Sequence, residues 1–341
     1  MMTAPRKALQ HLDSRGKRRD WTGAKLKAIA TAAAYRAADA ETHGKRAERI
    51  ANCANQLRFT VANDQLTLRN AYACKVRTCP VCMALNARRA FAILAARVAE
   101  HGRQHPRALP VLLTLTVRNV EPVQLANTVT LLTTAFRRLV RYRRVTRAVL
   151  GWHRSLEITF NPIRRDYHPH IHALMWMRDG YFAANSPLYL AQPDWVQLWA
   201  AATGYPPGIV HIKRLGRDTA GVLDANLDGL FEAVKYVVKP AGFYEQTAHG
   251  WRVAPEVLAT LHHAIAGRRL RDSGGSLRQI KAAEPPRRVS DDELAAAHVA
   301  LETYVFGETV DTWGEIFGPD YWQRAPPDEP AADVPVPPMS T

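Results

Sequence analysis

The chain has 341 residues, of which 47% are hydrophobic, so it can bury a substantial core and is not a disordered protein. It carries 46 lysines and arginines against 31 aspartates and glutamates, a formal net charge of +15. This excess favours a polyanionic partner, above all nucleic acid, over a neutral substrate, with a solubilising surface or an anionic membrane as the alternatives.

The sequence contains no membrane span and no secretory signal. No stretch reaches the roughly 18 consecutive apolar residues that a spanning helix needs, and the first twenty residues lack the apolar core of a signal peptide. We therefore expect a cytoplasmic protein without a membrane partner. In that compartment four cysteines are not expected to form structural disulfides, so their spacing points to other chemistry.

The N-terminal third of the sequence divides into two predicted segments. Residues 1–50 form a basic arm rich in alanine, arginine and lysine, with a helix over 22–40. Residues 51–105 hold all four cysteines and a helix over 84–100. Within this second segment LRFTVANDQLTLRN has the pattern of a strand, a turn and a second strand.

The cysteines have a spacing typical of a zinc site. Cys74, Cys79 and Cys82 form a C-x4-C-x2-C pattern, and Cys53 lies upstream, beyond the predicted strand pair. Zinc prefers four thiolates in a tetrahedron, and such a closed site is structural because it leaves no open position. A set of buried free thiols is the alternative, and histidine or water could replace Cys53 as fourth ligand.

Residues 106–270 form the predicted central domain, in which strands and helices alternate. We expect, in chain order, the strand VLLTLTVRN, a helix over 123–142 ending in the basic run RRLVRYRRVTR, the strand WHRSLEITF, the turn NPIRRDY, the strand HIHALMWM, a helix over 193–202, the strand PPGIVHIKRL, and a helix over 223–238 closed by Pro240. Residues 271–324 are predicted as a helical extension with a helix over 291–304, and the proline-rich, acidic residues 325–341 as a disordered tail.

Two histidines share one face of the predicted strand HIHALMWM. Side chains two apart in a strand point the same way, so His170 and His172 form half of a metal site. If this strand pairs with WHRSLEITF across a turn centred near 164 and 165, Glu157 lies almost opposite His172 on the same face. Two histidines and a carboxylate suit Mg²⁺ or Mn²⁺ beside a phosphate substrate, and zinc or iron are also possible. The plain alternative is one hydrogen-bonded core histidine and one partly exposed histidine.

The predicted helix over 223–238 carries a possible nucleophile. Glu232 and Tyr236 lie four residues apart and Lys239 follows after three more, so the three share one face, with Lys235 beside it. A nearby ammonium and a metal-polarised target can make a tyrosine hydroxyl attack phosphorus. Alternatively the helix is an ordinary amphipathic one with Tyr236 in the core.

The order of these motifs resembles that of the rolling-circle replication initiators of small plasmids. TCPVC, LLTLTVRN, LEITFN with HPHIHAL, and EAVKYVVK follow one another as in the HUH endonuclease superfamily, in its branch with one tyrosine and a glutamate one turn earlier. The resemblance covers residues 53–239. It implies an α+β fold with a central antiparallel sheet, ferredoxin- or RRM-like and flanked by helices, and a small zinc-binding element on its N-terminal side.

The resemblance also implies roles for single residues. His170 and His172 would be metal ligands, with Glu157 as the third ligand inferred from the hairpin. Tyr236 would attack one phosphodiester, giving a 5′-phosphotyrosine link and a free 3′-OH. Glu232 would activate water at termination, and Lys239 would stabilise the phosphate or phenolate charge. The expected cofactors are Mg²⁺ or Mn²⁺ at this site and a structural Zn²⁺ at the cysteines.

The implied partner is the double-strand origin of a plasmid, single-stranded or extruded as a hairpin, with host helicase and DNA polymerase. The basic runs RRLVRYRRVTR and KRAER would hold its phosphates. Thr114 and Thr116 match the first family motif, but their alternation with leucines favours a structural role. The alternatives are a transposase or relaxase with the same site, or a non-catalytic zinc-stabilised DNA-binding regulator.

Overall fold

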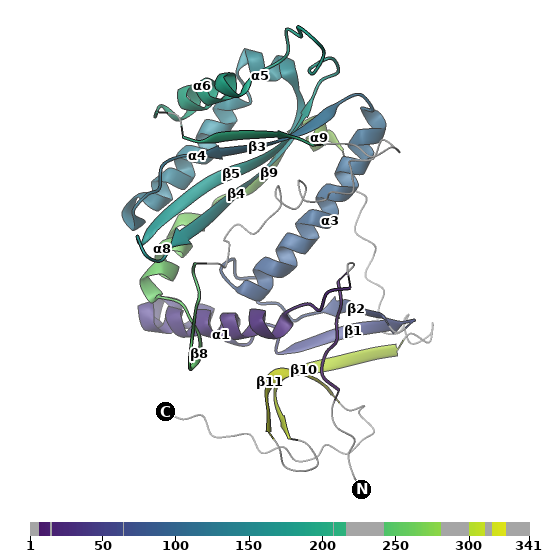
Figure 1. Cartoon of the computed structure of the whole chain (residues 1–341). Helices are drawn as coiled ribbons and strands as arrows, with labels where there is room; N and C mark the ends of the chain where they lie inside the picture. Colours follow the sequence, from purple (N-terminus) through teal and green to yellow (C-terminus); the bar gives the residue numbers. More distant parts are fainter. Residues whose placement is uncertain are drawn as a thin grey trace. The chain divides into compact units, whose positions relative to one another are not determined.

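The computed structural model describes residues 7–13, 16–63, 65–206, 208–215, 242–280, 300–310 and 316–324 (Figure 1). The chain divides into two compact units. The first contains residues 1–26, 51–74 and 288–341, and the second contains residues 27–50 and 75–287. The predicted helix over 223–238 and the predicted tail lie outside the described residues.

The first unit is built around a four-stranded antiparallel sheet. Its strand order is β11-β10-β1-β2, formed by β1 (Gln56–Ala62), β2 (Gln65–Asn70), β10 (Ala300–Val310) and β11 (Ile316–Gln323). Phe59 and Tyr304 pack edge to face, with ring centroids 5.7 Å apart, and both side chains are fully buried. The predicted strand, turn and strand over LRFTVANDQLTLRN are thereby confirmed.

The predicted C-terminal helical extension is wrong in its described part. Residues 300–304, the end of the helix predicted over 291–304, belong to β10, and residues 291–299 lie outside the described residues. Tyr304 stands opposite Leu57 of β1, and Thr303 stands opposite Arg58. The run TYVF has the aromatic and β-branched content of a strand, and pairing with β1 overrides the helical tendency of the alanines before it.

The predicted N-terminal helix is confirmed. The helix over 22–40 corresponds to α1 (Trp21–Ala38), and α2 (Ala40–Ala51) follows almost directly. On α2 the two buried side chains, Ala47 and Ile50, are three residues apart and therefore on one face.

The second unit is built around a five-stranded antiparallel sheet of strand order β6-β3-β5-β4-β9. The strands are β3 (Leu109–Thr116), β4 (Val149–Asn161), β5 (Asp166–Met177), β6 (Val210–Arg214) and β9 (Arg271–Gly275). The predicted hairpin is confirmed as β4 and β5. The edge strand of this sheet, β9, pairs with β4. The central domain therefore extends beyond its predicted boundary at residue 270.

Helices cover both faces of this sheet. On one face the odd-numbered side chains of β5, from Ile171 to Met177, pack in a core with α4 (Leu125–Leu139), α6 (Gln192–Thr203) and α8 (Pro255–Ile265). On the other face Leu174 and Trp176 pack against Leu94 and Val98 of α3 (Pro80–Gln104). His170 and His172 share this second face, so the apolar half of β5 anchors the strand beside them.

Short elements complete the second unit. They are a 3₁₀ turn (Pro122–Gln124), α5 (Arg143–Ala148), the hairpin β7 (Glu245–Thr247) and β8 (Gly250–Arg252), and α9 (Ser276–Gln279). The predicted helix over 123–142 is thus divided between the 3₁₀ turn and α4, and α5 follows. No helix among the described residues is both long and apolar enough to cross a membrane.

Candidate metal centre

Strand pairing brings the predicted carboxylate to the histidine face. Glu157 of β4 stands directly opposite His170, and Ser155 stands opposite His172. The prediction that Glu157 opposes His172 is wrong by two residues, because the turn is centred between residues 163 and 164. A shift of two keeps side chains on the same face, so Glu157 still faces both histidines.

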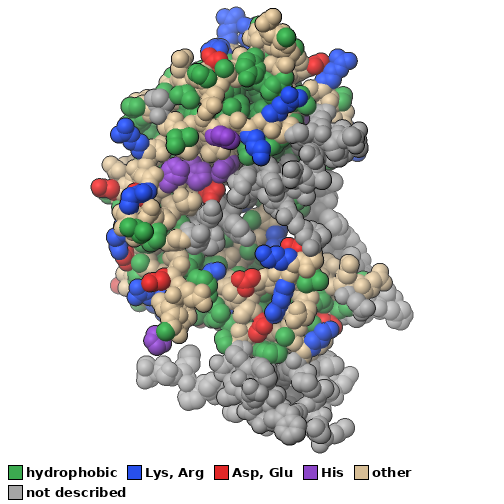
Figure 2. Space-filling model, in the orientation of Figure 1, with side chains coloured by type: hydrophobic (Ala, Val, Ile, Leu, Met, Phe, Trp, Pro, Cys, Tyr) green, Lys and Arg blue, Asp and Glu red, His purple; other side chains and the backbone are tan. Residues whose placement is uncertain are grey.

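The three side chains form a buried cluster. Glu157 Oε2 lies 3.1 Å from His172 Nε2 and 3.5 Å from His170 Nε2. One ligand atom from each side chain lies within 4.8 Å of the others, and the residues are 5 to 8% exposed. Figure 2 shows histidine side chains gathered on one face of the molecule, over the sheet of the second unit.

Hydrogen bonds on the far side of each ring orient the two imidazoles. His170 Nδ1 lies 3.1 Å from the carbonyl oxygen of His168, which can only accept, so this nitrogen carries the proton. His172 Nδ1 lies 3.3 Å from Thr114 Oγ1, and its Nε2 also faces Glu157. Such outer hydrogen bonds fix ring orientation in metal sites.

Thr114, which was predicted to have a structural role, contacts one of the two imidazoles. It stands opposite His172 on β3, in the same cross-strand row. Alternation along LLTLTVRN already predicts which face it occupies. The contact with His172 follows only from the pairing of β3 with β5.

The carboxylate is ionised at neutral pH. Burial raises the pKa of Glu157, but hydrogen bonds from His170 and His172 outweigh this and lower the pKa to about 2. A buried anion between two imidazoles is a donor set of one hard oxygen and two nitrogens, which Mg²⁺, Mn²⁺, Zn²⁺ and Fe²⁺ can all accept. The residues present fit the predicted divalent ion.

His168 lies beside this cluster and not within it. Its ring stacks on that of His170, with centroids 4.9 Å apart and an interplanar angle of 22°. Burial and the neighbouring His170 ring lower the pKa of His168. The ligand cluster contains Glu157, His170 and His172 alone among the described residues.

Each unit of the chain contributes two of the four cysteines, Cys53 and Cys74 in the first and Cys79 and Cys82 in the second. The backbone N–H of Cys74 donates to Cys53 Sγ at 3.3 Å, and that of Lys75 donates to Cys82 Sγ at 3.2 Å. Cys79 directly precedes Pro80, the first residue of α3. Within each unit an N–H donor to one sulfur suits a thiolate ligand, and the tetrahedral zinc site of all four cysteines stays a prediction.

The predicted nucleophile and its neighbours lie outside the described residues. This applies to Glu232, Lys235, Tyr236 and Lys239, so their positions relative to the histidines stay predictions.

Comparison with known proteins identifies the family. A model of a family described as "Replication protein" matches residues 65–313, more than half of the chain. A "Protein rep" of Lactiplantibacillus plantarum is 34% identical over 263 residues, covering 76% of this chain and 81% of the relative. A "Protein rep" of Bacillus amyloliquefaciens is 34% identical over 293 residues, covering 80% of this chain and 84% of the relative.

A further relative agrees. A "Protein rep" of Streptococcus pneumoniae is 30% identical over 283 residues, covering 81% of this chain and 82% of the relative. No solved structure matches the chain significantly. The chain therefore belongs to the replication protein family, as the order of its motifs predicted.

Proposed function

We propose that the chain initiates rolling-circle replication of a plasmid by nicking one strand at the double-strand origin and rejoining it at termination. The observation that carries this proposal is the ionised carboxylate of Glu157 between two histidines whose Nε2 atoms face it, in a member of the replication protein family. A buried carboxylate between two imidazoles, in a strongly basic chain, suits a metal-assisted reaction on a phosphodiester.

Glu157, His170 and His172 hold the divalent ion in this proposal. A bound Mg²⁺ or Mn²⁺ would polarise the scissile phosphate and stabilise the charge on the leaving oxygen. Thr114 and the carbonyl of His168 keep the two rings turned toward the carboxylate. The burial of the cluster also limits competing water, which strengthens its electrostatic effect.

The covalent step belongs to Tyr236. Its phenolic oxygen loses its proton and forms a bond to phosphorus, the bond from phosphorus to the 3′ oxygen breaks, and that oxygen takes up a proton to become a 3′-OH. Host polymerase extends this primer while host helicase unwinds the duplex. At termination Glu232 acts as general base for a water that cleaves the strand a second time. The new 3′-OH then attacks the phosphotyrosine, the bond from phosphorus to Tyr236 breaks, and the strand is rejoined, while Lys239 stabilises phosphate or phenolate charge.

The direct test is a nicking assay with an origin oligonucleotide labelled at its 3′ end. With Mn²⁺ the wild-type chain is expected to become covalently labelled, because the fragment 3′ of the nick carries the phosphotyrosine. Tyr236→Phe should form no adduct, whereas Tyr205→Phe, at a tyrosine that is 61% exposed, should behave as wild type. An adduct that persists in Tyr236→Phe would refute the assignment of the nucleophile.

A second measurement separates the enzyme from a DNA-binding regulator. Replacing His170 and His172 together by alanine should abolish nicking and leave most of the duplex affinity, because the phosphate contacts lie elsewhere. A regulator would form no adduct with any variant, and its affinity would not depend on Mn²⁺.

A further inference from the structure

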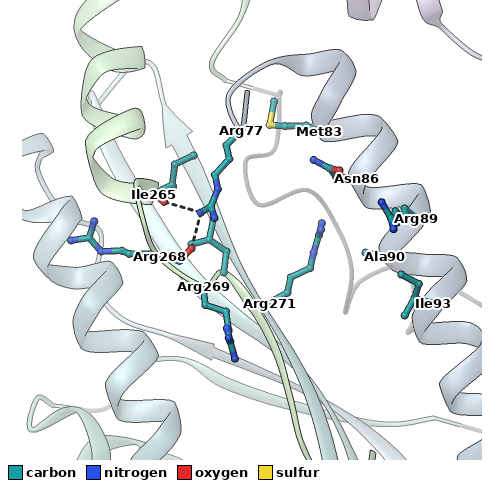
Figure 3. A pocket seen from close by; sticks show the side chains of 11 residues that line it. Arg77, Met83, Asn86, Arg89, Ala90, Ile93, Ile265, Arg268, Arg269 and Arg271 are labelled. Atoms are coloured by element: carbon teal, nitrogen blue, oxygen red, sulfur yellow. Dashed lines mark hydrogen bonds between the residues drawn. The ribbon is translucent and has the colours of Figure 1, made fainter. Parts of the chain in front are cut away.

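A cavity of about 390 Å³ lies between α3 and the segment that joins α8 to β9 (Figure 3). From α3 it is lined by Asn86, Arg89, Ala90 and Ile93, and from the opposite side by residues 268–271. Five of its lining residues are arginines, and none of the described lining residues is acidic. The cavity therefore suits an anion.

The cationic lining continues along α3 into an adjoining pocket of about 330 Å³. This pocket adds Arg97 of α3 and Arg278 to the lining, together with His153 and Asp272. Asp272 is already paired, with Arg278 at 3.1 Å and Arg269 at 3.5 Å. Among the described residues, seven arginines line the two pockets against this one carboxylate. We call this continuous feature the arginine groove.

Two of the arginines support the fold. Arg77 Nη1 donates to the carbonyl oxygens of Ile265 and Arg268, at 3.1 and 2.7 Å. Arg268 donates to the carbonyl of His263 at 3.1 Å. Carbonyl partners orient a guanidinium without cancelling its charge, so these arginines still add to the positive potential.

His153 is buried in the adjoining pocket beside arginines of the groove. Its Nδ1 lies 2.8 Å from Ser273 Oγ, and its Nε2 is buried with no hydrogen-bond partner among the described residues. Burial lowers the pKa of His153 to about 4, with further contributions from Arg271 and Arg97. Burial by itself would oppose an anion as well, so only the arginine contribution to this shift reflects the positive charge of the groove.

Strand pairing connects the groove to the candidate metal centre. Arg271 of β9 stands opposite Ser155, which stands opposite His172. Opposite residues share a face of the sheet, so Arg271 lies on the face of His172, two strand spacings or roughly 10 Å away. A chain of phosphates on this face can therefore contact the groove and the metal centre together.

We propose that the arginine groove binds the phosphate backbone of the origin strand on one side of the scissile phosphate. The assignment of DNA as ligand follows from the family and the charge, and the position beside the nick rests on the function proposed above. Arg89 and Arg269 are exposed groove residues without a supporting role in the core, so they are the residues to change.

The test measures binding of a single-stranded origin oligonucleotide by fluorescence anisotropy at several salt concentrations. All variants carry Tyr236→Phe, so that binding is read without covalent capture. Arg89→Ala and Arg269→Ala should each weaken binding by roughly tenfold. Each should also make the negative slope of log K against log salt shallower by about 0.7. Arg103→Ala is the matched control, because Arg103 is an exposed arginine of α3 outside the groove that pairs with Glu100.

Further arms decide between the outcomes. Arg89→Lys should keep most of the slope, since it keeps the charge. Slopes unchanged in both alanine variants, with thermal melting as in the parent, would overturn the proposal. If both alanine substitutions lowered affinity for inorganic phosphate but not for the oligonucleotide, the groove would be a small-anion site and the proposal would also fail. Shallower slopes in these variants, together with no adduct from the wild-type chain in the nicking assay, would support the groove and refute the nicking function alone.

Discussion

Replacing Glu157 by glutamine tests the metal centre with the smallest change in shape. Glutamine keeps the length of the side chain but removes the charge and one of two carboxylate oxygens, leaving His170 and His172 as the strong ligands. Loss of an outer hydrogen-bond partner weakens metal sites by roughly 10 to 100-fold. Because Glu157 Oε2 lies within 3.5 Å of both Nε2 atoms, we treat it as a direct ligand and expect a loss of at least about 100-fold in Mn²⁺ affinity.

The expected change in melting temperature follows from linkage. At a Mn²⁺ concentration of 100 times the wild-type Kd, binding stabilises the folded chain by about 2.7 kcal/mol, and in the variant by about 0.4 kcal/mol. For a unit of this size these free energies correspond to roughly 5 to 10 °C for wild type and about 1 °C for the variant. Differential scanning fluorimetry with and without Mn²⁺ measures both shifts, and titration calorimetry gives the affinities.

The control is Glu245→Gln, which removes one negative charge from an exposed carboxylate paired with Arg252. It should keep the full Mn²⁺ shift, because it changes the net charge equally but lies outside the cluster. Equal Mn²⁺ affinity in wild type and Glu157→Gln would refute the reasoning, and equal losses in both variants would show that only net charge matters.

Three further predictions concern the rest of the chain. The wild-type protein should hold one zinc ion. Cys79→Ser should hold little or none and should melt at a lower temperature. Equal zinc content of the two proteins in elemental analysis would contradict the four-cysteine site. Since the pKa of His153 is about 4 in the folded chain, its contribution to stability is complete above about pH 6.5 and falls by about 3 kcal/mol as the pH drops to 4. The free energy of unfolding, measured with urea at pH 7, 5 and 4, should therefore change less with pH in His153→Gln than in wild type. An equal change in both proteins would contradict this prediction. Trp199 Nε1 donates to the carbonyl of Thr116 at 2.8 Å in the core, so Trp199→Phe should lower the free energy of unfolding by about 1 to 3 kcal/mol; a loss below about 0.5 kcal/mol would show that the carbonyl finds another partner.

Local patterns in the sequence predicted most of the second unit. The alternation in HIHALMWM places His170 and His172 on one face, because a strand repeats every two residues whatever it pairs with. The hairpin of β4 and β5 was predicted because its two strands are adjacent in the chain. The order of motifs predicted the family because each motif is read from a few neighbouring residues.

Pairing between distant parts of the chain was not predictable in the same way. Residues 300–304 form a strand because they pair with β1, and no local signal specifies that partner. The two-residue difference in register that places Glu157 opposite His170 depends on the conformation of the turn and on packing across the sheet.

The sequence by itself determined which side chains could form the metal centre, since strand alternation and the short hairpin are properties of neighbouring residues. Only the tertiary structure decided what surrounds that centre. Thr114 reaches His172 through the pairing of β3 with β5, and Arg271 joins the same face through the pairing of β9 with β4. The physical reason is that such pairings depend on the packing of a whole sheet, which is a property of residues far apart in the chain.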